Sequence, residues 1–229
     1  MRTTVLVRFA LLGLISLLAA LAPAAYSAAA TLEISVTDEQ GRPIEEVAVY
    51  ATPTDGAAAA PAAHAGSEPK AVMDQQELQF VPHLLIVQTG TEVMFPNGDD
   101  VSHHVYSFSE AKPFELPLYK GNVYPPVVFD QPGVVVLGCN IHDGMLGYIV
   151  VVDTPHYAKT DEHGVARIDG VPSGDYILAA WTPRARPAAL PASQQITVGE
   201  GPAAAEIHIT GRLSPGHEHT VSSLTWDRY

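Results

Sequence analysis

One connection between two predicted strands decides how this chain folds: Gly138-Cys139-Asn140-Ile141-His142-Asp143-Gly144-Met145-Leu146-Gly147. The runs on either side, Val134–Leu137 and Tyr148–Val152, are short, apolar and rich in β-branched residues, which favours buried strands. Cys139 therefore ends one strand, and His142 and Met145 lie on a tight loop before the next. This arrangement aims a thiolate, an imidazole and a thioether at one point.

The three side chains form most of a copper ligand set. A soft thiolate, imidazole nitrogens and a weak axial thioether suit both oxidation states of copper. Zinc prefers several thiolates or three nitrogen and oxygen ligands, so a methionine argues against it. One more imidazole is needed, and His103 and His104 follow a predicted strand end at Asn97. Side chains of adjacent strand residues point to opposite faces, so we expect one of the two to be the ligand.

The start of the chain predicts export. Arg2 and Arg8 precede an apolar run from Phe9 to Leu21, and small residues follow, as in a secretory signal peptide over residues 1–30. Cys139 is the only cysteine, so it has no partner for an internal disulfide in an oxidising compartment. We expect a soluble periplasmic protein without stable membrane insertion after cleavage; retention as an N-terminal anchor is the alternative.

The charge balance is strongly acidic. Removing residues 1–30 takes away two arginines and no acidic residue, so the net charge falls from −13 to about −15. Such a surface repels nucleic acid and attracts a basic partner in a salt-dependent way. The alternative is that this charge serves only solubility.

Past residue 30 the pattern predicts strands, and we find no convincing helical period. We allow for a helical turn between Glu110 and Lys120. An Ala, Gly and Pro-rich stretch, residues 53–70, predicts a linker, and residues 213–229 predict a loosely packed tail. The remaining predicted strands include Leu32–Val36, Val47–Tyr50, Leu84–Val87, Val93–Phe95, His104–Phe108, Val127–Phe129, Val165–Ile168, Tyr176–Trp181, Ile196–Val198 and Glu206–Thr210.

Residues 71–153 resemble the cupredoxins, the plastocyanin and amicyanin family. The segment "CNIHDGMLGYIVVV" (139–152) has the C-x2-H-x2-M spacing of amicyanin, and "FVPHLLIVQTGTEVMFPN" (80–97) is similar to the family's second and third strands. In the family a ligand histidine lies six positions after a strand-closing asparagine, which selects His103 after Asn97. The resemblance thus implies one mononuclear type 1 (blue) copper held by His103, Cys139, His142 and Met145.

Three positions depart from the family pattern. His104 stands where an asparagine commonly follows the ligand histidine, and Phe108 lies one position later than the family's core aromatic counted from His103. Either a residue is inserted after His103, or His104 is the ligand. Ile141 replaces a common proline before the loop histidine.

The flanking segments resemble a second fold. The segments "VTDEQGRPIEEVAVYA" (36–51) and "TDEHGVARIDGVPSGDYILAAW" (160–181) look like two halves of a carboxypeptidase-regulatory-like (transthyretin-like) domain. Insertion into an exposed loop is tolerated where the two ends lie close together. We therefore expect an all-β chain, with a Greek-key cupredoxin β-sandwich (71–153) nested in a small Ig/transthyretin-like sandwich (31–52 and 154–212). One continuous sandwich with long loops is the alternative.

These patterns predict single-electron transfer rather than enzymatic catalysis, because protein side chains fill every ligand position. The combination resembles exported proteins labelled methylamine-utilization or plastocyanin-like. We expect a redox partner, a cytochrome or a redox enzyme, that docks at an edge of His142 between Ile141 and Leu146. The alternatives are a periplasmic copper carrier or chaperone and a structural or adhesion-type module with a vestigial metal site.

Overall fold

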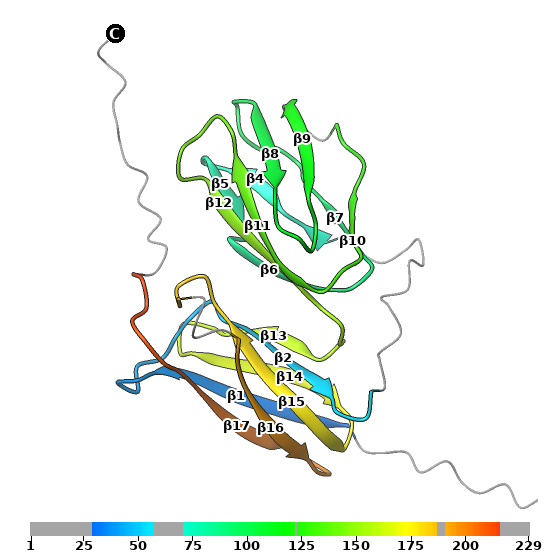
Figure 1. Cartoon of the computed structure of the whole chain (residues 1–229), viewed down its shortest axis with the longest axis vertical. Coiled ribbons are helices and arrows are strands. Elements are labelled where there is room, and N and C mark those ends of the chain that lie inside the picture. Colours follow the sequence, from blue (N-terminus) through cyan, green and yellow to red (C-terminus); the bar gives the residue numbers. More distant parts are fainter. Residues whose placement is uncertain (1–28, 57–70, 122, 187–190, 216–229) are drawn as a thin grey trace, which may run out of the picture.

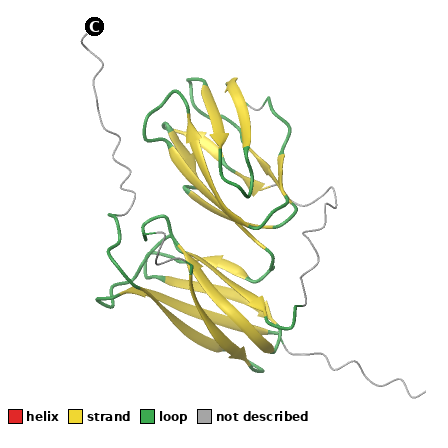
Figure 2. Ribbon diagram, viewed as in Figure 1, coloured by secondary structure: helices red, strands yellow, loops and turns green. Residues whose placement is uncertain are grey.

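The computed structural model describes residues 29–56, 71–121, 123–186 and 191–215. Nearly all of the predicted signal peptide, most of the linker and most of the tail lie outside these ranges. Within these ranges the regular elements are all β-strands, so the expectation of an all-β fold is confirmed (Figure 2). We find no helix in the described residues that is long and apolar enough to span a bilayer.

The strands are β1 (Ala30–Asp38), β2 (Ala48–Pro53), β3 (Ala71–Val72), β4 (Asp74–Gln76), β5 (Gln79–Val81), β6 (Leu84–Gln88), β7 (Thr91–Met94), β8 (His103–Ser107), β9 (Phe114–Tyr119), β10 (Val127–Phe129), β11 (Gly133–Cys139), β12 (Leu146–Val152), β13 (Tyr157–Lys159), β14 (Val165–Val171), β15 (Gly174–Trp181), β16 (Ala192–Val198) and β17 (Ala203–Ile209).

Strands β1 and β2 form one β-sandwich with strands β13 to β17. Its sheets have the orders β14-β1-β17 and β13-β2-β15-β16, so strands more than 100 residues apart are neighbours (Figure 1). β1 alternates strictly between buried and outward-facing residues, as a strand covered on one face must. Leu32, Ile34 and Val36 point inward and join a buried core with Val49 and Leu178.

The middle of the chain forms a second sandwich. A five-stranded sheet, β6-β12-β11-β8-β9, faces the smaller sheet β10-β7-β3, with the β4-β5 hairpin beside them. Its core is separate from the first and includes Phe80, Phe129, Leu137 and Ile149. The division into a split host sandwich and an inserted module remains our proposal, and this strand pairing supports it.

An apolar layer joins the two sandwiches. Ala48 of the host packs with Leu84, Val150 and Val152 of the inserted module, all at most 3% exposed. Tyr148 stacks obliquely on Trp181 with ring centroids 5.5 Å apart. The outer face of β6 and β12 is therefore buried by the host, while the β11–β12 loop lies at the far end of the inserted module (Figure 1).

The expected helical turn between Glu110 and Lys120 is wrong, because β9 occupies Phe114–Tyr119. β9 lies at the edge of its sheet, and β8 is its one neighbour among the described strands. His103 pairs with Tyr119 and Val105 pairs with Leu116, so β9 has one extra residue between these two pairs. Pro117 lies in this bulge, where a missing N–H disrupts no ladder. The short strands β3, β4 and β13 also went unpredicted, because few apolar residues mark them.

Candidate metal centre

Three predicted ligands converge at the far end of the inserted module. The Cys139 Sγ lies 3.6 Å from the Nδ1 of His103 and 3.6 Å from the Nδ1 of His142. The two Nδ1 atoms are 3.1 Å apart. In the described part of the chain, these residues are the one group of three or more His, Cys, Asp or Glu side chains whose ligand atoms lie close enough together to hold a metal ion.

Backbone hydrogen bonds fix the conformation of the β11–β12 loop, residues 140–145. The N–H of Met145 donates to the carbonyl of His142 at 3.3 Å, which closes a turn, and Gly144 adopts φ +79° within it. A positive φ at this third position suits glycine in a type II turn. The N–H of Asn140 donates to the carbonyl of His104 at 3.1 Å, so the loop is also fixed to β8.

Met145 lies beside this cluster in sequence and in the same core. Its residue is 5% exposed, and it belongs to the buried group that contains Cys139 and Leu137. The N–H of Cys139 donates to the carbonyl of Met145 at 3.3 Å, which brings the two ends of the loop together. Met145 is thus buried in the same core as Cys139, and a backbone hydrogen bond joins the two residues.

The structure separates the two adjacent histidines. His103 is fully buried and faces Cys139, and Val105 lies on the same face of β8. His104 points to the other face, where its Nε2 meets the Glu115 carboxylate at 2.8 Å. Phe108 follows the end of β8 and is 87% exposed, so it is not a core aromatic of this chain.

Asp99 orients His103 from behind. Its Oδ2 accepts a hydrogen bond from the His103 Nε2 at 2.7 Å, and the carboxylate also accepts the backbone N–H groups of Glu77 and Leu78. Burial raises the pKa of Asp99, but these hydrogen bonds outweigh it and hold that pKa below its usual value. Because the ionised carboxylate only accepts, the imidazole proton lies on Nε2, and the lone pair of Nδ1 faces the cluster.

A buried polar network supports the loop before His103. The Nδ2 of Asn97 donates to the carbonyls of Val101 and Tyr119, and its Oδ1 accepts the N–H of Asp99. The hydroxyl of Tyr119 donates to the carbonyl of Phe95 and accepts from Gln75. Asn97 therefore fixes the turn that carries both Asp99 and His103.

Two glycines flank the metal loop because aromatic rings lie against them. A Cβ on Gly138 would be 2.8 Å from the Tyr106 ring, and one on Gly147 would be 2.7 Å from Phe80. No Cβ fits at such distances without movement of the ring. Phe80 is 1% exposed, so it closes the core beneath the loop.

The outer edge of the loop reaches the surface. His142 is partly exposed, and Ile141 and Leu146 are 48% and 45% exposed. Desolvation and the positive charge that His103 would carry lower the pKa of His142 below 6.5, against an opposing effect of Asp99. Metal binding needs the neutral imidazole, so this shift favours ligation near neutral pH.

The spacing of the ligand atoms fits a first-row metal ion. Bonds of about 2.0–2.1 Å to nitrogen and about 2.3 Å to sulfur, at tetrahedral to trigonal angles, separate N from N by roughly 3.3–3.6 Å and S from N by roughly 3.5–3.8 Å. The observed 3.6 Å, 3.6 Å and 3.1 Å lie within a few tenths of an ångström of these ranges. The donor set of one thiolate, two imidazoles and a nearby thioether suits copper.

Comparison with solved structures finds cupredoxins that are similar to part of this chain. A reduced Cu(I) form of an amicyanin mutant is 21% identical and covers 38% of this chain and 85% of that chain, with a TM-score of 0.34. Another reduced amicyanin mutant is 24% identical over 41% of this chain and 92% of that chain, with a TM-score of 0.34. A purple cupredoxin from Nitrosopumilus maritimus is 22% identical over 37% of this chain and 100% of that chain, with a TM-score of 0.32.

The cupredoxin resemblance expected from the sequence is therefore confirmed over part of the chain. No protein-family model matches the chain, and no curated protein does. Because these identities and TM-scores are low, the evidence for the ligand set comes from the residues and geometry of this chain and not from the matched structures.

The side chains that support the ligands were not predicted from the sequence. Asp99 lies four residues before His103, and this short interval between a carboxylate and a candidate ligand was the available signal. Phe80 and Tyr106 carried no such signal, because their contacts with the loop are long-range. A separate pocket, lined by other residues, lies in the host sandwich.

Proposed function

We propose that this chain is a periplasmic single-electron carrier that binds one type 1 copper ion through His103, Cys139, His142 and Met145. The observation that carries the proposal is the convergence of one thiolate and two Nδ1 atoms within 3.1 to 3.6 Å. A bound copper ion would supply the cupric/cuprous couple. Since every ligand comes from the protein, we propose that the chain is not an enzyme.

The surrounding residues suit electron transfer by holding the ligands still. Asp99 fixes the His103 ring, and the backbone bonds of Asn140 and Met145 fix the loop. Both Cys139 and Met145 are under 10% exposed, which keeps bulk water from the two proposed sulfur ligands. A rigid, dry site needs little rearrangement when its charge changes by one.

The surface supports a docking edge at His142. Its ring lies partly exposed between two exposed apolar residues, Ile141 and Leu146, so a partner could approach the cluster there. Asp100 and Asp143 are exposed on the loops nearby in sequence. The net charge, about −15 without residues 1–30, would steer a basic cytochrome or redox enzyme, and added salt would slow that association.

The test is spectroscopic. Purified protein loaded with Cu(II) should show intense visible absorption from thiolate-to-copper charge transfer and a narrow copper hyperfine splitting in its EPR spectrum. Cys139→Ser and His103→Ala should lose both signals, while His104→Ala, which changes a neighbouring imidazole outside the cluster, should keep them. Copper-loaded protein without the charge-transfer band would overturn the proposal.

Copper carriage is the second candidate, and the partial exposure of His142 favours it, because an acceptor could reach that ligand directly. The two roles differ in what leaves the site. Fast electron self-exchange with copper retained supports the electron carrier. Slow self-exchange, with stoichiometric copper loss to an apo acceptor protein, supports the carrier of copper.

A further inference from the structure

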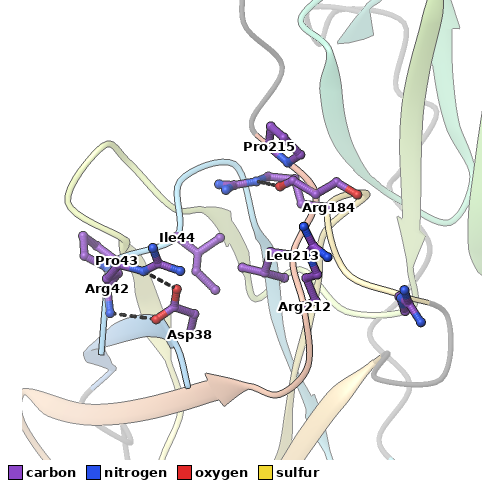
Figure 3. Close-up of a pocket in the computed structure, with 10 residues that line it drawn as sticks. Asp38, Arg42, Pro43, Ile44, Arg184, Arg212, Leu213 and Pro215 are labelled. Atoms are coloured by element: carbon purple, nitrogen blue, oxygen red, sulfur yellow. Dashed lines mark hydrogen bonds and ion pairs between the residues drawn. The ribbon is translucent and has the colours of Figure 1, made fainter. Parts of the chain in front are cut away.

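The host sandwich contains a pocket of about 660 Å³ that the copper proposal does not use. Three segments form it: the turn after β1, the loop after β15 and the segment after β17. Figure 3 shows side chains from all three arranged around one hollow. Its volume lies within the range of small-molecule sites, roughly 300–1,000 Å³.

Arginines gather at this pocket. Of the five arginines that the structure describes, all but Arg167 line it: Arg42, Arg184, Arg186 and Arg212. This gathering occurs in a chain whose net charge is −13, with 12 basic residues against 25 acidic ones. Four like charges around one hollow repel each other, so the arrangement is stabilised when an anion enters.

The acidic groups near the pocket already have partners. Asp38 is the only acid among the described lining residues, and its carboxylate accepts the N–H groups of Gln40 and Arg42 and the Arg42 Nε. Glu39, beside an adjoining smaller pocket, accepts the N–H of Gly211. The described lining therefore contains one carboxylate and four guanidinium groups.

The guanidinium groups are presented in two ways. Arg42 is held by Asp38 at 2.7 Å, and the Arg184 Nε donates to the carbonyl of Ser214 at 3.1 Å, as Figure 3 shows. Both groups are thereby positioned while other N–H groups stay available. Arg186 and Arg212 are exposed, and among the described residues no carboxylate pairs with either one.

The floor of the pocket is apolar. Ile44 is 1% exposed, and Leu213 packs against the host core. An apolar floor lined by four arginines suits a compact ligand that carries charged groups on more than one side. The planar guanidinium fork matches the oxygen pairs of both phosphates and carboxylates.

We propose that this pocket binds a small polyvalent oxyanion bearing phosphate or carboxylate groups. Arg186 and Arg212 supply the unpaired charge, and Arg42 and Arg184 are the positioned donors. The binding is independent of the copper site, which lies at the far end of the other sandwich.

Isothermal titration calorimetry of the copper-loaded full chain, with inorganic pyrophosphate in one arm and citrate in the other, tests this proposal. Saturable binding is expected in at least one arm, and the tighter arm identifies the chemical class. Arg186→Gln and Arg212→Gln should each weaken it about tenfold. Arg167→Gln is the matched control, because Arg167 pairs with Glu33 outside the pocket and its loss should leave the affinity unchanged.

Two outcomes would overturn the proposal. One is the lack of saturable heat in both arms. The other is an equal loss of affinity in Arg167→Gln and in the two pocket variants, which would show a general charge effect. The visible copper spectrum should stay the same in all three variants, so a failed copper site would be recognised separately.

Discussion

Replacing Asp99 by asparagine should weaken copper binding without removing any ligand. In the native site three N–H groups converge on this carboxylate: those of Glu77 and Leu78, and the His103 Nε2 at 2.7 Å. An amide has one acceptor oxygen, so its NH₂ group must face a donor or take the Nε2 lone pair. In the second case the imidazole proton moves to Nδ1, the atom that faces Cys139.

The expected loss follows from this geometry. Removing an outer-shell partner of a ligating histidine typically costs about 10- to 100-fold in metal affinity, or roughly 1.4–2.8 kcal/mol. The measurement is a competition titration of Cu(I) and Cu(II) against a chelator of known affinity, at a temperature where circular dichroism shows the variant folded.

Asp100→Asn is the matched control for this substitution. It makes the same charge change one residue away, but the Asp100 side chain is fully exposed and lies 3.6 Å from Lys120. Its copper affinity should stay within about twofold of the wild type, as for a surface ion pair. If Asp99→Asn and Asp100→Asn had the same affinity, Asp99 would have no role in orienting His103.

Three further predictions concern stability. Gly147→Ala should cost about 1–3 kcal/mol in urea denaturation, because its Cβ would lie 2.7 Å from Phe80, whereas Gly199→Ala, with open space around it, should change little. Leu84→Ala should cost about 2–5 kcal/mol by leaving a cavity between the sandwiches, while the copper spectrum stays intact; an unchanged denaturation midpoint would contradict the apolar layer. Burial raises the pKa of Tyr119 from 10.0 to about 12, so the unfolded chain ionises first and stability falls as pH rises from 10 to 12. Tyr119→Phe should make this alkaline decline shallower in pH-dependent thermal melts, and an equally steep decline would refute that assignment.

The all-β class and the metal loop could be predicted from local sequence. Alternation along β1 and the short apolar runs of β11 and β12 reflect which face of each strand is covered, and neighbouring residues record this. The spacing of Cys139, His142 and Met145 is also local, because one tight turn connects them. These features therefore needed no knowledge of distant contacts.

The tertiary structure decided what strand alternation left open. Alternation shows that His103 and His104 face opposite sides, but only the packing of the β6-β12-β11-β8-β9 sheet onto the rest of its sandwich shows which side is the interior. Asp99 gains its role from backbone groups of the β4–β5 turn, some 20 residues earlier. The arginine pocket joins segments near residues 42, 184 and 212. Such contacts depend on how strands far apart in the chain pair, and no local pattern of residues encodes that pairing.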